Sequence, residues 1–158
     1  MSLSRFIGKA QTAIDGKGRS SFPREFRRQL GPTEGNEFVV ACGPNHTLRL
    51  YLTSEFDKFM AEIDALKARQ QAAIFRSQLE APTVEMDGQN RILIPKNLLE
   101  YAGLTNEVIY VADRGWSLDL WNPERYNAKY GKKTEEDVTA FSEMFYKLGL
   151  PEGLDDKR

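Results

Sequence analysis

The chain contains the same motif twice, 72 residues apart. Residues 13–31 read AIDGKGRSSFPREFRRQLG, and residues 85–103 read EMDGQNRILIPKNLLEYAG. An internal duplication predicts two copies of one supersecondary unit, because each copy must bury its apolar face against a neighbour. It also marks the residues that the chain uses twice, which are the pairs Asp15/Asp87, Gly16/Gly88, Arg19/Arg91, Pro23/Pro95 and Gly31/Gly103.

The similarity continues beyond the glycines, with an offset of 70 residues. NEFVVA at 36–41 matches NEVIYV at 106–111, and TLRLY at 47–51 matches SLDLW at 117–121. The first copy has two additional residues in the loop between these parts, a change that a connecting loop tolerates at small entropic cost.

Each copy predicts the same order of elements. A strand enters an Asp-Gly turn and a second, short strand ends at a proline, after which a helix starts. Alternating apolar residues then indicate two more strands joined by a turn at 43–45 or 113–115. The predicted helices cover 24–30 and 96–102, and the predicted strands cover 38–42, 47–52, 108–112 and 116–121.

Helical segments are predicted after each copy. Ser54 is a candidate N-cap, and apolar residues at helical spacing continue, with a break, as far as Leu79. Asn122 and Pro123 begin another helix, which Gly131 interrupts before a last helical face that ends at Leu148. Four aromatic residues occupy spacings typical of a buried core: Phe56, Phe59, Trp121 and Phe145.

The length of 158 residues fits one compact domain or two small pseudo-symmetric halves. No apolar run is long enough to cross a membrane, and the start of the chain lacks the apolar stretch of a signal peptide. The single cysteine, Cys42, cannot form an intramolecular disulfide. We therefore expect a cytoplasmic protein without a membrane partner.

Charge is distributed unevenly, although the net charge is only −1. Residues 1–30 contain seven Lys or Arg and two acidic residues, whereas residues 134–158 contain seven acidic and three basic residues. This distribution indicates either an electrostatically polarised molecule suited to an anionic partner, or ordinary solvated surface.

The repeated turn contains a possible anion-binding arrangement. Asp15 precedes a glycine, and its carboxylate can accept hydrogen bonds from backbone amides of the turn. Arg19 can reach back to Asp15 or point outward, and an arginine held by a carboxylate is oriented for phosphate or guanine. Lys17 lies at the tip of the turn. The alternative is a hairpin turn stabilised by a local ion pair, although exposed ion pairs stabilise too little to explain the repetition.

The two copies differ in charge. Gln89 and Asn90 replace Lys17 and Gly18, and REFRR at 24–28 becomes KNLLE at 96–100. If the ligand is nucleic acid, the first copy provides more phosphate contacts. The alternative for Arg24, Arg27 and Arg28 is a solvated helix face.

These features together resemble the MraZ family, which has two SpoVT-AbrB-type domains in tandem. The resemblance rests on Phe6-Ile7-Gly8, on Asp15 to Arg19 with Phe22-Pro23 and Phe26-Arg27, on Asp87 to Arg91 with Ile94-Pro95, and on Leu118-Asp119-Leu120-Trp121. It implies an α+β fold of two pseudo-symmetric AbrB-like swapped-hairpin (double-split β-barrel) repeats. The corresponding segments are 7–54 and 82–125 for the repeats, 55–81 for connecting helices, and 126–158 for a helical segment with an acidic tail.

The resemblance also implies a function. A MraZ-like chain is expected to be a nucleoid-associated, sequence-specific transcriptional regulator that forms a ring-like homo-oligomer. It would bind repeated elements in double-stranded DNA upstream of a division and cell-wall gene cluster. Asp15, Arg19, Asp87 and Arg91 take the places of the family's Asp-x-x-x-Arg signature, and the residues expected to contact DNA are Asp15, Lys17, Arg19, Arg24, Asp87 and Arg91. Ser20 and Asn90 depart from the family pattern, in which an aliphatic residue and a glycine are usual.

Other functional classes fit less well. The only histidine, His46, lies in a predicted hairpin turn, and one Cys with one His cannot form a zinc cluster. We expect no catalytic residues, metal or cofactor, and so no enzyme. An AbrB-like antitoxin or an oligomeric scaffold for protein interaction remains the alternative, with the acidic C-terminal segment as a docking site.

Overall fold

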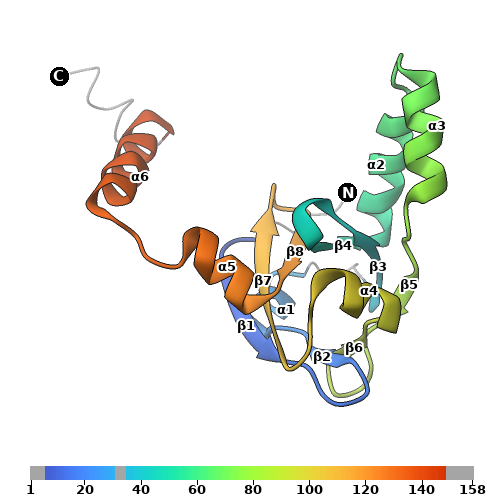
Figure 1. Ribbon diagram of the computed structural model, residues 1–158, viewed down its shortest axis with the longest axis horizontal. Helices are drawn as coiled ribbons and strands as arrows, with labels where there is room; N and C mark the ends of the chain where they lie inside the picture. The colour runs from blue at the N-terminus through green and yellow to red at the C-terminus, as the bar shows by residue number, and fades with distance from the viewer. Residues whose placement is uncertain (1–5, 31–34, 149–158) are drawn as a thin grey trace. The chain divides into compact units, whose positions relative to one another are not determined.

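The computed structural model describes residues 6–30 and 35–148 of the chain, which divide into two compact units after Pro123. The first unit contains all the strands of the described residues (Figure 1). The second unit contains α6 (Glu135–Leu148) and all but the first residue of α5 (Pro123–Tyr130). Among the described residues, none of the helices is both long enough and apolar enough to cross a membrane.

A six-stranded antiparallel sheet forms the centre of the first unit. Its strand order is β1-β7-β8-β4-β3-β5, and a separate two-stranded ribbon pairs β2 with β6. The sheet strands are β1 (Lys9–Ala13), β3 (Glu37–Cys42), β4 (Leu48–Leu52), β5 (Thr83–Glu85), β7 (Glu107–Asp113) and β8 (Ser117–Trp121), and the ribbon strands are β2 (Arg19–Ser21) and β6 (Arg91–Leu93).

The two sequence repeats pair with each other throughout this unit. β1 of the first repeat pairs with β7 of the second, and β5 of the second pairs with β3 of the first. At the centre of the sheet, β4 and β8 occupy equivalent places in the two repeats and pair in antiparallel register. If each strand is replaced by its equivalent in the other repeat, the sheet has the same strand order, read from the opposite edge. The architecture is α+β with two repeats that share one sheet.

The short helices follow the two prolines. α4 (Lys96–Ala102) has the predicted bounds and ends at Gly103, whose φ of 64° is the left-handed C-terminal conformation that glycine favours. α1 (Arg24–Arg27) is shorter than predicted, because Gln29 and Leu30 continue in tight turns whose amides bond three residues back. Gly31, the expected cap of α1, lies outside the described residues.

Two longer helices, α2 (Thr53–Asp64) and α3 (Arg69–Gln78), form a hairpin that projects from the sheet (Figure 1). The break predicted in this segment is confirmed. Ser54 is not the N-cap, because β4 passes directly into α2 and the helix starts one residue earlier, with Leu52 in the cap position.

The core fills the space between the sheet, the ribbon and the two short helices. Phe22 stacks on Phe38 with ring centroids 5.3 Å apart, and Phe6 meets Phe26 edge to face. Burial of such apolar side chains is the main force that stabilises the unit. The side chains with less than 2% exposure include residues of both repeats: Phe26, Phe38, Val40, Leu48, Leu50, Ile92, Ile94, Leu98, Tyr110, Leu118 and Leu120.

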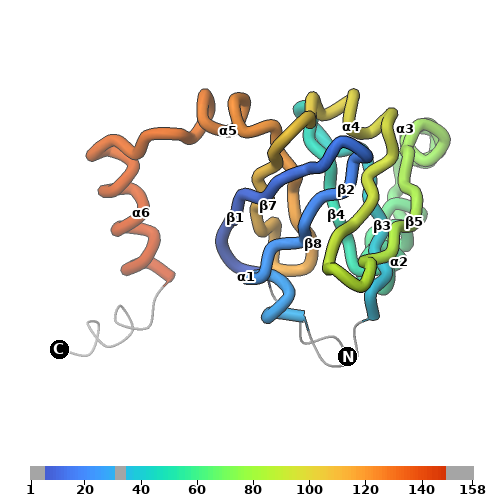
Figure 2. Tube along the Cα trace, turned by 90° about the horizontal axis from the view of Figure 1, so that it is seen from below, coloured from blue at the N-terminus to red at the C-terminus, as the bar shows by residue number. Residues whose placement is uncertain are grey.

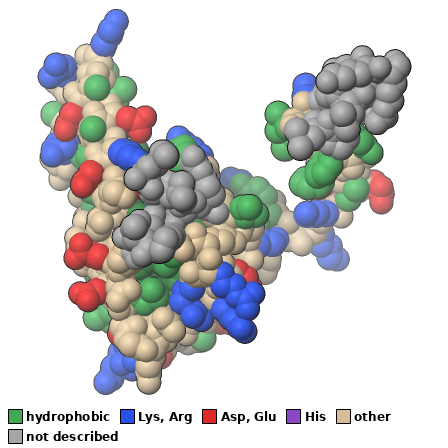
Figure 3. All heavy atoms as spheres, turned by 180° about the vertical axis from the view of Figure 1, so that it is seen from behind, with side chains coloured by type: hydrophobic (Ala, Val, Ile, Leu, Met, Phe, Trp, Pro, Cys, Tyr) green, Lys and Arg blue, Asp and Glu red, His purple; other side chains and the backbone are tan. Residues whose placement is uncertain are grey.

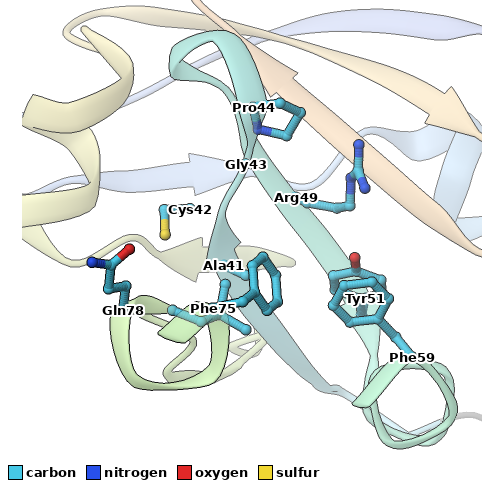
Figure 4. A pocket seen from close by; sticks show the side chains of 10 residues that line it. Ala41, Cys42, Gly43, Pro44, Arg49, Tyr51, Phe59, Phe75 and Gln78 are labelled. Atoms are coloured by element: carbon cyan, nitrogen blue, oxygen red, sulfur yellow. The ribbon is translucent and has the colours of Figure 1, made fainter. Parts of the chain in front are cut away.

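The α2–α3 hairpin packs on the other face of the sheet through aromatic contacts. Phe56 and Phe59 both contact Tyr51, and Phe59 also meets Phe75 of α3. A cavity of about 460 Å³ remains between α2, α3 and the strands β3 and β4, lined by apolar side chains together with Cys42, Arg49 and Gln78 (Figure 4). Phe59 lines this cavity, and Phe56 and Phe59, both predicted to be buried, are half-buried.

Of the other two aromatic residues predicted to be buried, Trp121 is buried and Phe145 is not. Phe145 lies on α6 with 57% of its surface exposed, and α6 has no buried residue. Helical spacing identifies an apolar face, but it does not say what covers that face. The interruption at Gly131 is confirmed, since α5 ends at Tyr130.

Candidate nucleic-acid interface

The first Asp-Gly turn is closed by the carboxylate of Asp15. One oxygen, Oδ1, accepts hydrogen bonds from the backbone N–H of Lys17 and of Arg19, both at 2.9 Å. The other, Oδ2, accepts a hydrogen bond from the Arg19 Nε at 2.7 Å. Arg19 therefore reaches back to Asp15, and its two Nη groups form the outer end of a side chain that is still 32% exposed.

The second turn has the same construction. Asp87 Oδ1 accepts from the backbone N–H of Gln89 at 2.8 Å and of Arg91 at 2.9 Å, and Oδ2 accepts from Arg91 Nε at 2.9 Å. Asn90 takes the place of Gly18 in this turn. Its φ is 61°, a left-handed conformation that asparagine tolerates better than most residues with a side chain. The replacement of glycine therefore preserves the turn.

Backbone hydrogen bonds connect each turn to the opposite repeat. The Gly18 carbonyl accepts from the Ile94 N–H at 3.0 Å, and the Asn90 carbonyl accepts from the Phe22 N–H at 2.8 Å. Gly18 has a φ of 85°, and a Cβ there would lie 3.0 Å from Leu99 Cδ1. Glycine is favoured at this position because of its positive φ, and a side chain here would crowd Leu99 of the second repeat.

The two turns lie at the same end of the first unit because β2 and β6 are adjacent (Figures 1 and 2). Arg91 Nη1 is 4.0 Å from Asp15 Oδ2, so the second arginine also faces the first aspartate. The structure thus brings together four of the predicted site residues, Asp15, Arg19, Asp87 and Arg91, in one surface that both repeats contribute to.

Hydrogen bonding keeps both aspartates in their charged form. The backbone N–H of Arg19 is the main cause of a lowered pKa for Asp15, and the backbone N–H of Arg91 has the same effect on the pKa of Asp87. Neither carboxylate is therefore protonated near neutral pH. Each arginine is held by a constant negative charge and retains donors for an anion or a base edge.

The remaining two predicted residues are exposed. Lys17 lies at the tip of the first turn. Arg24 begins α1, three residues beyond Ser21, and Ser21 pairs with Arg91 across the ribbon. Figure 3 shows Lys and Arg side chains gathered on one face of the molecule in the region of α1, the helix that carries Arg24 and Arg27.

The surroundings of Ser20 explain why it departs from the family pattern. It is fully buried, and its Oγ is 2.7 Å from the hydroxyl of Tyr110. In the duplication, the position equivalent to Ser20 is Ile92, and the position equivalent to Tyr110 is Val40. Burial raises the pKa of Tyr110, so its hydroxyl stays neutral and needs a hydrogen-bond partner. The polar residue at 20 is thus matched to a tyrosine at 110.

A charge pair at the centre of the sheet was missed by the sequence analysis. Arg49 of β4 and Asp119 of β8 are directly opposite each other, with Arg49 Nε 3.0 Å from Asp119 Oδ1. Burial raises the pKa of Asp119, and the Arg49 guanidinium opposes this rise. These residues are equivalent in the duplication, so identical residues would place like charges opposite each other. The alignment of LRL at 48–50 with LDL at 118–120 already shows the two opposite charges at equivalent positions.

Comparison with known proteins identifies the family. The sequence profile described as "MraZ protein, putative antitoxin-like" matches residues 6–76 and again residues 78–146. A protein of Leuconostoc citreum named transcriptional regulator MraZ is 33% identical over 141 residues, which cover 87% of this chain and 94% of that protein. Proteins of the same name from Desulfitobacterium hafniense and Halothermothrix orenii are 32% and 33% identical, each over 92% of this chain and 99% of their own length. The chain belongs to the MraZ family.

Proposed function

We propose that this chain is a sequence-specific DNA-binding transcriptional regulator. The observation that supports this most is the pair of turns with the same hydrogen bonding, in which an aspartate holds an arginine by its Nε, on a ribbon that both repeats form. Arginines oriented in this way suit the guanine edge in the major groove, which admits a two-stranded β-ribbon. The names of the relatives are consistent with this role.

The residues would divide their work by position. Arg19 and Arg91 would read base edges, and their aspartates would orient them. Lys17 and Arg24, which are exposed at the tip of the first turn and at the start of α1, would contact phosphates and fix the register of the protein on the duplex. The second turn has Gln89 in place of Lys17, so we assign the larger part of the binding energy to the first turn.

We further propose that the strand exchange between the repeats represents the swapped-hairpin, double-split β-barrel arrangement, with SpoVT-AbrB-like domains at 7–54 and 82–125. The helical segments 55–81 and 126–158 would then serve assembly into a ring-like homo-oligomer in the cytoplasm, associated with the nucleoid. One chain presents only two turns, so tight binding requires several copies on repeated DNA elements. By resemblance, these elements lie upstream of a division and cell-wall gene cluster.

A second candidate function is that of an antitoxin, since the family description contains the word antitoxin-like. An antitoxin would bind a toxin protein as its principal partner. The basic first turn and the cationic face near α1 favour DNA, because a module that binds only protein has no need of them.

The test is a titration of the full-length protein, after its mass in solution has been measured, against the DNA upstream of its own gene and against a scrambled duplex of equal length. At two salt concentrations, we expect tighter binding to the upstream DNA and a steep loss of affinity with salt. Equal affinity for both duplexes would refute a sequence-specific regulator. A stoichiometric co-purifying protein whose removal leaves no DNA binding would support the antitoxin instead.

A further inference from the structure

The outward face of the β2·β6 ribbon carries four side chains in a fixed pattern. Arg19 is opposite Leu93, and Ser21 is opposite Arg91. The two central residues of the ribbon point inward and are fully buried. Side chains alternate between the faces of a strand, so the four outward residues form the surface that the ribbon presents to a ligand. Each arginine thus has a partner from the other repeat beside it.

Leu93 differs from its counterpart in the other repeat. Position 21, its equivalent, is a serine, whereas Leu93 is a large apolar side chain with 55% of its surface exposed. Its Cδ1 would lie 3.9 Å from a Cβ placed on Gly18, so the side chain leans across the ribbon toward the first turn. An isolated exposed leucine needs no explanation, but this one is the cross-strand partner of Arg19.

The chemistry of the major groove gives this position a ligand. A guanine presents two acceptors that a single arginine can contact, and a thymine presents a 5-methyl group that apolar side chains contact. An arginine with an adjacent leucine therefore suits a guanine with a neighbouring thymine. The other half of the ribbon pairs Arg91 with Ser21, and a serine hydroxyl has no comparable preference for a methyl group.

We propose that Leu93 is a specificity-determining residue that contacts the 5-methyl group of a thymine beside the base read by Arg19. This inference rests on the proposed DNA-binding function. It makes the two halves of the recognition site unequal: the half read by Arg19 and Leu93 favours a thymine methyl, and the half read by Arg91 and Ser21 does not. The asymmetry follows from the difference between Ser21 and Leu93, because the other outward positions of the two strands carry arginine in both repeats.

The experiment compares DNA with thymine and DNA with uracil, which lacks only the 5-methyl group. The upstream duplex is prepared in both forms and titrated with wild type, with Leu93→Ser and with the control Leu66→Ser. Leu66 is also an exposed leucine, at 47%, but it lies between α2 and α3. Burial of one methyl group corresponds to about a fourfold change in affinity.

We expect wild type and Leu66→Ser to bind the uracil duplex about fourfold more weakly for each methyl contact that is lost. Leu93→Ser should bind the thymine duplex with that reduced affinity, and replacing thymine by uracil should weaken it no further. Equal binding of both duplexes by wild type, or full sensitivity to uracil in Leu93→Ser, would overturn the inference. So would a lower mass of Leu93→Ser in solution, which would assign Leu93 to a contact between copies. Failure of wild type to prefer upstream over scrambled DNA is a different result, and it refutes the proposed function itself.

Discussion

The buried hydroxyl pair of Ser20 and Tyr110 links the two repeats and can be tested by a double-mutant cycle. The Oγ of Ser20 is 2.7 Å from the Tyr110 hydroxyl, and both side chains are fully buried. Ser20→Ala removes this partner from Tyr110, whose hydroxyl then remains in an apolar site. Tyr110→Phe removes the hydroxyl itself, while the Ser20 Oγ retains the Ser21 carbonyl at 3.3 Å.

These differences set the expected magnitudes. A buried polar group without a partner costs about 1–3 kcal/mol, so Ser20→Ala should lower the free energy of unfolding by that amount. Loss of the hydrogen bond alone costs about 0.5–1.5 kcal/mol, which is the expectation for Tyr110→Phe. The double variant removes both polar groups. Its loss should therefore be smaller than the sum of the single losses by about 1 kcal/mol.

The assay is urea unfolding at one fixed protein concentration, followed by circular dichroism, with equal m-values required for all four proteins. A second pair of variants, Ser20→Ile and Tyr110→Val, introduces at each position the residue found at the equivalent position of the other repeat. Each alone should be destabilising, since isoleucine overfills the site and valine leaves a void, whereas together they should recover part of the loss. Additive losses in both cycles would refute the view that positions 20 and 110 are matched to each other.

Three further predictions concern the turns and the sheet centre. Gly18→Ala should lower the free energy of unfolding by about 1–2 kcal/mol, because the φ of residue 18 is positive and alanine disfavours such a conformation. Asn90→Gly should change the free energy of unfolding little. Equal losses for the two variants in urea unfolding would contradict this prediction. The pKa of Asp15 in the folded protein should lie below 3.8. The stabilising contribution of this carboxylate is therefore complete above the unfolded-state pKa of about 3.9 and is lost as pH falls through the lower folded-state pKa. An NMR titration of the carboxyl group that gives a pKa of 3.8 or more would refute this prediction. Arg49→Asp should lower the free energy of unfolding by about 1–3 kcal/mol, and adding Asp119→Arg should restore most of the loss. No recovery in the double variant would mean that the pair contributes nothing.

Local features of the fold could be predicted from the sequence because their causes lie within a few residues. An aspartate before a glycine and an arginine four residues on determine the turn, and the structure has this hydrogen bonding in both copies. Proline at its start and glycine at its end set the bounds of α4. The break between α2 and α3 followed from an interrupted apolar pattern in the same way.

Features that depend on which segments meet were harder to predict. Alternation in β4 and β8 showed which side chains are buried, but only the register of these strands places Arg49 against Asp119. The same limit applies to Ser20, whose partner Tyr110 is 90 residues away. Phe145 was wrongly assigned to the core because helical spacing alone cannot say whether another element covers that face. The DNA-contacting roles of the six predicted site residues remain predictions.

The measurement that tests the central proposal most directly is the affinity for upstream DNA of Arg19→Ala, compared with Arg91→Ala and with the control Arg69→Ala. Arg69 is an exposed arginine at the start of α3, so its variant removes the same charge away from the ribbon. Loss of a bidentate arginine–base contact costs about 1–3 kcal/mol, or roughly 5- to 150-fold in affinity. We predict this loss for Arg19→Ala, a smaller loss for Arg91→Ala, and wild-type affinity for Arg69→Ala. Full affinity of Arg19→Ala at moderate salt would contradict the assignment of the paired turns as the DNA-reading surface.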